Sequence, residues 1–111
     1  MTSSAGPGGG RLDVGTAVKG SELWIFISGD ADISTLGHID AALGSIVLDG
    51  LKAACIDLSG LGFVDVAALR RLTTFAMHLR QSGLDVKTVG APPLLRRVAR
   101  LVPAQELLGL V

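Results

Sequence analysis

The stretch that decides the fold reads AACIDLSGLGFVD and covers residues 53–65. Its first part, residues 53–58, is a short apolar run flanked by turn-forming residues, which is typical of a strand buried on both faces of a sheet. Ser59 to Asp65 is interpreted as a loop, after which Val66 starts an apolar repeat of three to four residues. The segment therefore predicts a strand, a loop and a helix in that order.

Strands and helices alternate on both sides of this segment. The predicted elements are strands over 12–19 and 23–28, a helix over 34–50, the strand over 53–58, a helix over 66–82, a strand over 84–89 and a helix over 93–102. Ser34 is the expected cap of the first helix, and Gly50 and Gly83 are expected to end the first two helices.

The order of these elements predicts the fold class. Strands that helices connect should be parallel, whereas a short turn joins the first two strands into a hairpin. We therefore expect an α/β fold: a single domain over residues 11–111, with a mixed sheet of four to five strands and helices packed against it. Residues 1–10 are predicted to form a disordered tail.

Composition excludes several classes of partner. The chain has 111 residues, of which 49% are hydrophobic and 18% are charged, as expected for one folded domain. Ten Lys and Arg balance ten Asp and Glu, so the broad positive field that binds nucleic acid or anionic membranes is missing. The apolar stretches fall short of the roughly 18 residues of a membrane span, and the N-terminus lacks a signal-peptide pattern. We expect a cytoplasmic protein that binds neither nucleic acid nor membrane.

Residues able to carry out chemistry are few and scattered. His38 and His78 have no Cys or carboxylate at metal-ligand spacing, and no glycine-rich phosphate loop follows a strand, so we expect no metal and no cofactor. The single cysteine, Cys55, lies in an apolar run, where a buried and inert thiol is the common state. Several carboxylates could gather at one end of the sheet, namely Asp30, Asp32, Asp57 and Asp65. Because Asp before a helix commonly caps it, we expect no catalytic residue, while a small enzyme using these groups stays open.

Two motifs resemble those of a known family. Residues 56–65, IDLSGLGFVD, resemble the strand-and-loop signature of STAS domains, the family of the bacterial anti-anti-sigma factors, which are also called anti-sigma factor antagonists. Residues 29–32, GDAD, are similar to the family's Gly-Glu/Asp-x-Asp. The order of elements over about residues 12–108 also agrees with the family, so the resemblance implies the STAS fold for nearly the whole domain.

The resemblance also implies a partner and shows a missing switch. In anti-anti-sigma factors, a partner that is both the anti-sigma factor and a histidine-kinase-like protein phosphorylates the second serine of Asp-Ser-Ser-Gly. Here Asp65 is followed by Val66, Ala67 and Ala68, so Ala67 stands at the acceptor position and no phosphorylation is expected there. The other hydroxyls near the motifs or on the second helix are Ser34, Thr35, Ser59, Thr73 and Thr74. Of these, Ser34 is expected to cap a helix and Ser59 to bond the loop backbone.

The expected function is that of a regulatory binding module. By resemblance, the chain is an anti-sigma factor antagonist-like protein that regulates sigma-factor-dependent transcription through an anti-sigma factor kinase. The expected partner-binding residues are Asp30, Asp32, Ser59, Asp65, Val66, Ala67 and Arg70. The alternative is a STAS module that works without phosphorylation and binds a small ligand or nucleotide, or scaffolds a signalling complex. The oligomeric state stays open, with a homodimer as one arrangement.

Overall fold

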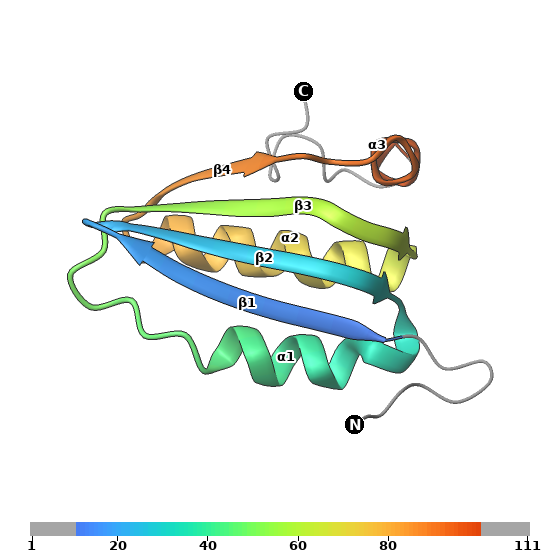
Figure 1. Ribbon diagram of the computed structural model, residues 1–111, viewed down its shortest axis with the longest axis horizontal. Coiled ribbons are helices and arrows are strands. Elements are labelled where there is room, and N and C mark those ends of the chain that lie inside the picture. Colours follow the sequence, from blue (N-terminus) through green and yellow to red (C-terminus); the bar gives the residue numbers. More distant parts are fainter. Residues whose placement is uncertain (1–10, 101–111) are drawn as a thin grey trace.

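The sheet begins with the predicted antiparallel hairpin. In the computed structural model, which describes residues 11–100, β1 (Leu12–Lys19) pairs with β2 (Glu22–Ala31) across a turn in which Gly20 has a φ of 62°. β2 runs parallel to β3 (Ala53–Val64), and β3 runs parallel to β4 (Asp85–Val89). The strand order is β1-β2-β3-β4, so the described residues form a mixed four-stranded sheet, in agreement with the prediction (Figure 1).

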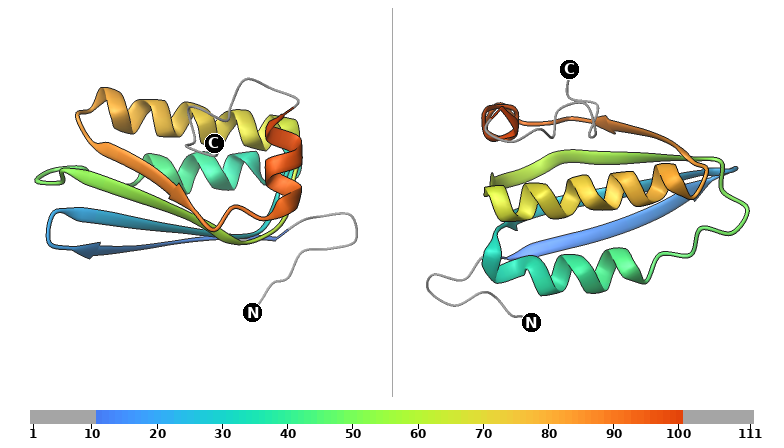
Figure 2. Two further views of the ribbon diagram at one scale, coloured as in Figure 1. Left: turned by 90° about the horizontal axis from the view of Figure 1, so that it is seen from above. Right: turned by 180° about the vertical axis from the view of Figure 1, so that it is seen from behind.

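The two longer helices cover one face of this sheet. After a single turn of 3-10 helix, η1 (Ile33–Thr35), come α1 (Leu36–Gly44), α2 (Val66–Gln81) and α3 (Pro93–Ala99). Figure 2 shows α1 and α2 side by side on the same face, with α3 near one end of the sheet. Alternate strand residues point toward these helices and form the core with them, namely Leu23, Ile25, Ile27, Ala54, Ile56, Leu58, Leu69, Leu72, Ala76 and Leu79.

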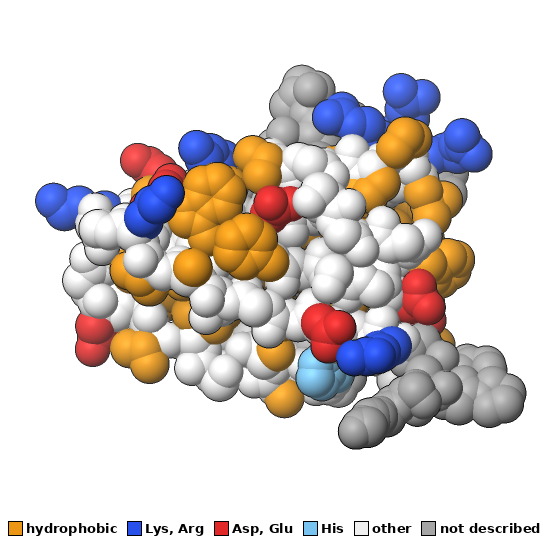
Figure 3. All heavy atoms as spheres, viewed as in Figure 1, with side chains coloured by type: hydrophobic (Ala, Val, Ile, Leu, Met, Phe, Trp, Pro, Cys, Tyr) orange, Lys and Arg blue, Asp and Glu red, His pale blue; other side chains and the backbone are white. Residues whose placement is uncertain are grey.

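The opposite face of the sheet carries an aromatic pair. Trp24 stacks on Phe26 with 6.0 Å between the ring centroids, and the Lys87 ammonium lies 6.0 Å from the Trp24 ring. Cys55 pairs in register with Trp24 and Lys87 and is fully buried, which confirms the expected buried thiol. Figure 3 shows hydrophobic side chains gathered over this face, which neither α1 nor α2 covers.

The predicted end of β3 was wrong, because the strand continues through the predicted loop to Val64. Gly60 marks the reason. It pairs with Ser28 where the register between β2 and β3 shifts, and a Cβ on residue 60 would lie 2.6 Å from the Ser28 Cβ. Glycine, which as a local signal favours a turn, is here the residue that lets the two strands approach. β2 is likewise longer than the predicted strand over residues 23–28 and ends at Ala31.

The predicted bounds of the first helix were also wrong. α1 ends at Gly44, and the Ser45 hydroxyl donates to the Ala42 carbonyl, 2.8 Å away. Gly50, the predicted end, instead has a φ of 77° and shapes the connection to β3. Ser34 is not the cap of α1, because it lies inside η1, whose own cap is Asp32; the Asp32 side chain accepts the Ser34 amide at 2.8 Å. Thr35 stands at the N-cap position of α1 and makes no side-chain capping bond there.

α2 follows the prediction closely, whereas α3 is shorter than predicted. α2 ends at Gln81, and Gly83, after the C-cap Ser82, has a left-handed conformation with a φ of 96°. α3 ends at Ala99 with Arg100 as its C-cap, so the predicted continuation of this helix to residue 102 was wrong. The predicted tail over residues 1–10 lies outside the described residues. Within residues 11–100, no helix is long and apolar enough to cross a membrane.

Candidate partner-binding site

The two motifs meet at the edge where β2 and β3 end. In register, Asp30 pairs with Phe63 and Ala31 pairs with Val64. The Asp65 amide donates to the Ala31 carbonyl at 3.0 Å, which ties the start of α2 to the end of β2. Because parallel strands end at the same edge of a sheet, segments some thirty residues apart in sequence form one surface there (Figure 1).

Asp65 is the residue that holds this edge together. One carboxylate oxygen, Oδ1, accepts the amide of Ala68 at 2.8 Å and so caps α2. The other oxygen, Oδ2, accepts the amide of Ile33 at 3.0 Å, from the segment that follows β2. The prediction that an aspartate here caps the helix is confirmed. The second contact fixes the distance between the two motifs.

Asp32, directly after β2, caps the 3-10 turn η1 as Asp65 caps α2. Its Oδ1 accepts the backbone amide and the hydroxyl of Ser34, and its own amide donates to the Thr35 hydroxyl at 3.0 Å. The Thr35 hydroxyl donates in turn to the Asp30 carbonyl, 3.0 Å away. This reciprocal capping satisfies amides that would otherwise lack partners at the start of a helix. Among residues 11–100, no hydrogen bond or ion pair engages the half-buried Asp30 carboxylate, which stays available to a partner.

The first turn of α2 presents the other predicted residues outward. Ala68 and Leu69 are fully buried, so the helical period leaves Val66 and Ala67 half-exposed and Arg70 exposed. The backbone around Ala67 belongs to a regular, capped helix start. Ala67 therefore occupies a surface position at a helix N-terminus.

Sequence reasoning missed two large apolar side chains at this edge. Ile33 is 74% exposed and its amide binds Asp65, while Phe63 is 44% exposed and pairs with Asp30. Neighbouring residues of a strand face opposite sides, so with Val64 buried, Phe63 has to point outward. That signal is present in the sequence, but it becomes readable only when residues 59–64 are assigned to the strand.

Ser59 and Asp57 lie apart from the other predicted residues. Ser59 is inside β3, roughly 20 Å before Asp65 at the rise of an extended strand. Its hydroxyl donates to Asp57 Oδ1 at 2.7 Å and its amide donates to the same oxygen at 2.9 Å, so the expected bond to the loop backbone was wrong. Asp57 pairs with Val89 of β4, so it does not join the three carboxylates at the edge.

The titratable groups offer no assembled chemistry within the described part of the chain. Among residues 11–100, no three His, Cys, Asp or Glu side chains lie close enough together to hold a metal ion. His38 and His78 are exposed on α1 and α2, as the sequence predicts. Burial raises the pKa of the Cys55 thiol, so this group is held as the less nucleophilic neutral form.

The sequence matches a known protein family over most of its length. Residues 14–109 match the family described as Mlab, STAS domain. The chain belongs to the STAS family. This match covers most of the chain and agrees with the resemblance carried by residues 56–65. No curated protein sequence matches the chain.

Solved structures share the STAS fold. An anti-sigma factor antagonist from Mycobacterium paratuberculosis superposes with a TM-score of 0.74 at 23% identity, over 95% of this chain and 87% of that one. An antisigma-factor antagonist STAS domain from Rhodobacter sphaeroides gives 0.58 at 17% identity, over 75% and 88%. The anti-sigma factor antagonist SpoIIAA in its unphosphorylated form gives 0.60 at 15% identity, over 83% and 84%. The predicted fold is confirmed.

Proposed function

We propose that this STAS domain is an anti-sigma factor antagonist that acts in the cytoplasm by binding an anti-sigma factor of the histidine-kinase-like class. The observation that carries the proposal is the edge where Asp65 joins the end of β2 to a capped α2. The proposal is supported by the way this edge brings the ends of β2 and β3 and the start of α2 together on one surface. The solved structures with this fold include proteins named anti-sigma factor antagonists.

The composition of this edge suits a protein partner. Exposed Ile33 and Phe63 supply apolar area, while Asp30 and Arg70 supply charges of both signs around it. Protein interfaces combine an apolar, often aromatic centre with a polar rim in this way. Asp32 Oδ1 and both oxygens of Asp65 accept bonds from backbone amides of this chain, which supports a role in shaping the surface over a role in catalysis.

The second part of the proposal is that binding is not controlled by phosphorylation at the family position. A phosphate there would add close to two negative charges beside a helix N-terminus and change partner affinity. Ala67 has no hydroxyl to accept it. The other candidates support the same conclusion: Thr35 and Thr73 are buried, and the hydroxyls of Ser34, Ser59 and Thr74 are hydrogen-bonded.

A capture experiment with matched variants tests this function. The tagged chain is used to purify its partner from the lysate of the source cell, and mass spectrometry identifies the partner and any phosphate on the bait. We expect a histidine-kinase-like anti-sigma factor on an unmodified bait. Phe63→Ser should reduce its recovery at least about tenfold if Phe63 is an interface anchor.

The control is Met77→Ser, which removes another exposed apolar side chain, 38% exposed and farther along α2. It should recover as much partner as the unaltered chain. Recovery that is equal for all three proteins would contradict the proposed surface. A bait phosphorylated in stoichiometric amount would contradict the absence of a switch.

The homodimer stays a prediction, and we assign it to the uncovered face of the sheet. Phe26 is 42% exposed there beside Trp24, and Glu22 and Lys87 border the rings with opposite charges 4.0 Å apart. A second copy related by a two-fold axis would therefore meet a complementary surface. Sedimentation at rising concentration measures this, and a mass that stays at 11.4 kDa throughout would contradict the dimer.

A further inference from the structure

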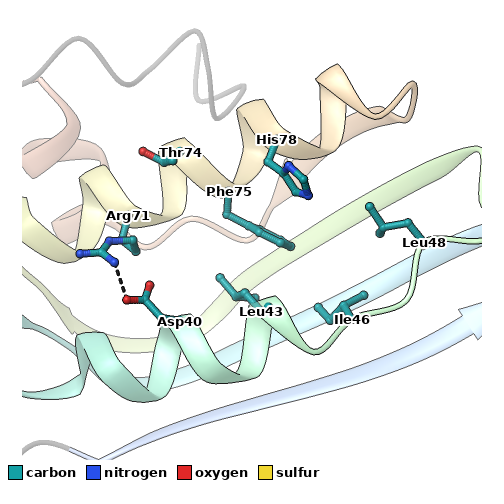
Figure 4. A pocket seen from close by; sticks show the side chains of 9 residues that line it. Asp40, Leu43, Ile46, Leu48, Arg71, Thr74, Phe75 and His78 are labelled. Carbon is teal, nitrogen blue, oxygen red and sulfur yellow. Dashed lines mark hydrogen bonds and ion pairs between the residues drawn. The ribbon is translucent and has the colours of Figure 1, made fainter.

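A groove runs between α1 and α2, away from the edge that we propose for the protein partner. It encloses about 350 Å³, near the lower end of the range for small-molecule sites. Figure 4 shows its apolar wall, made by Leu43, Ile46, Leu48 and Phe75, and its polar residues Asp40, Arg71, Thr74 and His78. An apolar groove with few polar groups is the usual form of a ligand site.

The early end of α1 creates this groove. Because the helix stops at Gly44, Ile46 and Leu48 lie outside it and pack against the core from irregular chain. Both side chains are half-buried, and Phe75 of α2 faces them across the groove (Figure 4). A continued helix would have closed this space with its own turns.

At the charged end of the groove, Arg71 has hydrogen-bond donors that no acceptor within residues 11–100 uses. Asp40 accepts from one guanidinium nitrogen of Arg71, Nη1, and the two side chains are 47% and 43% exposed. An arginine has five N–H donors, and a guanidinium is the group that best matches a carboxylate. An exposed ion pair contributes little to stability, so Arg71 can share its donors with a second carboxylate at small cost.

The helix directions decide how a ligand would lie. α1 and α2 run the same way, and their C-terminal ends lie toward Leu48 (Figure 1, Figure 4). The C-terminal end of a helix carries partial negative charge, which disfavours an anion at that end. A carboxylate is therefore favoured near Arg71, and an apolar chain is favoured from Leu43 toward Leu48.

We propose that this groove binds a linear monocarboxylate with a medium-length alkyl chain. Its carboxylate contacts Arg71, and its chain lies along Leu43, Phe75, Ile46 and Leu48. At about 30 Å³ for each non-hydrogen atom, the volume holds on the order of ten such atoms, the size of octanoate. The site is independent of the proposed anti-sigma factor surface.

Titration with sodium octanoate, followed by two-dimensional amide NMR, tests the proposal on the full chain. We expect saturable shifts in residues 40–48 and 71–78, with affinity rising from butanoate through hexanoate to octanoate. Octylammonium, which has the same chain and the opposite charge, should bind at least about fivefold more weakly.

Three exposed positions make the test specific. Arg71→Gln should weaken octanoate binding at least about fivefold, whereas Asp40→Asn, which removes the competing carboxylate, should strengthen it about two- to fivefold. His38→Gln, on α1 but outside the groove lining, should leave binding unchanged. Leu48→Asn should remove the gain from hexanoate to octanoate.

Several results would overturn the proposal. These are shifts that grow without saturation, equal binding of octanoate and octylammonium, or weaker octanoate binding by Asp40→Asn. The amide spectra also report folding, so loss of binding by a variant counts only when its other signals keep their wild-type positions. Arg71→Lys keeps the positive charge but lacks the planar guanidinium that can donate two parallel bonds to a carboxylate, so its affinity for octanoate should lie between those of the unaltered chain and Arg71→Gln.

Discussion

Replacing Asp65 by alanine should destabilise the free protein, whatever its partner. The substitution removes the cap of α2, which is worth about 1 kcal/mol, and the bond from the Ile33 amide, worth about another 1 kcal/mol. Water can replace part of the second bond, because that contact is exposed. The expected loss is therefore about 1.5 kcal/mol of unfolding free energy, or a fall in Tm of roughly 8 °C for a domain of this size.

Urea denaturation followed by circular dichroism measures this loss. Asp65→Asn keeps one acceptor oxygen for the Ala68 amide but not the carboxylate for the second contact, so it should lose about half as much. Asp49→Ala is the control, because Asp49 is exposed and, among residues 11–100, no hydrogen bond or ion pair involves it. If Asp65→Ala stays within about 0.5 kcal/mol of the unaltered chain, the structural role assigned to Asp65 is refuted.

Three further predictions concern the switch, the hairpin and the thiol. Ala67→Asp should reduce binding of the captured anti-sigma factor at least about tenfold in calorimetry while changing unfolding free energy by less than about 1 kcal/mol, whereas Ala67→Ser should bind normally. Gly29→Ala should lower the unfolding free energy measured in urea by more than about 3 kcal/mol, because Gly29 has a φ of 95° and a Cβ there would lie 2.0 Å from the Arg11 carbonyl oxygen. The control is Gly15→Ala, which should lower it by less than about 1 kcal/mol, because no atom lies within 4 Å of a Cβ at that position. Burial raises the pKa of the Cys55 thiol, so the folded chain keeps a proton that the unfolded chain loses above roughly pH 8.5. Unfolding free energy should thus fall as the pH rises above that value, and the urea midpoint of Cys55→Ala should fall less.

The order of elements could be predicted because local signals mark it. α2 illustrates this: Asp65 caps its start, Gly83 follows its end, and its six buried residues recur at helical spacing between them. Each signal acts within a few residues and needs no knowledge of neighbours. The prediction for this helix therefore agrees with the structure to within one residue.

The errors arose where tertiary contacts outweighed local signals. Gly60 reads locally as a turn, but it is required where β3 approaches Ser28 of β2. Ile46 and Leu48 lie within the predicted helix over residues 34–50, yet they pack against the core from irregular chain after the helix has ended. Helical propensity is a weak prior beside such packing, so neither the length of β3 nor the groove beside α1 was visible in the sequence.

The candidate site was predictable in its motifs but not in its assembly. Residues 29–32 and 56–65 were identified by resemblance, and each motif ends in an aspartate that caps a helix, Asp32 or Asp65. The bond between Ile33 and Asp65 joins them, and it depends on the parallel register of β2 and β3. Ser59 was predicted to belong to this site because residues 59–65 were interpreted as a loop, and the two ends of a loop can lie close together. In the structure residues 59–64 belong to β3, which separates Ser59 from Asp65.

By the resemblance, Ala67 and Ala68 stand at the positions of the family's Ser-Gly pair, and both residues bear on the stability of the helix as well as on the proposed loss of the switch. Ala68 is fully buried and should stabilise the helix start by about 0.5–1 kcal/mol over glycine. Ala67 likewise favours the helix over serine. Asp65, which carries both bonds of the edge, keeps the family identity. The shape of the proposed surface thus depends on Asp65, and not on a hydroxyl at residue 67. On this reasoning the proposed antagonist binds in one constant state, so its effect would follow its abundance or a ligand bound elsewhere on the domain.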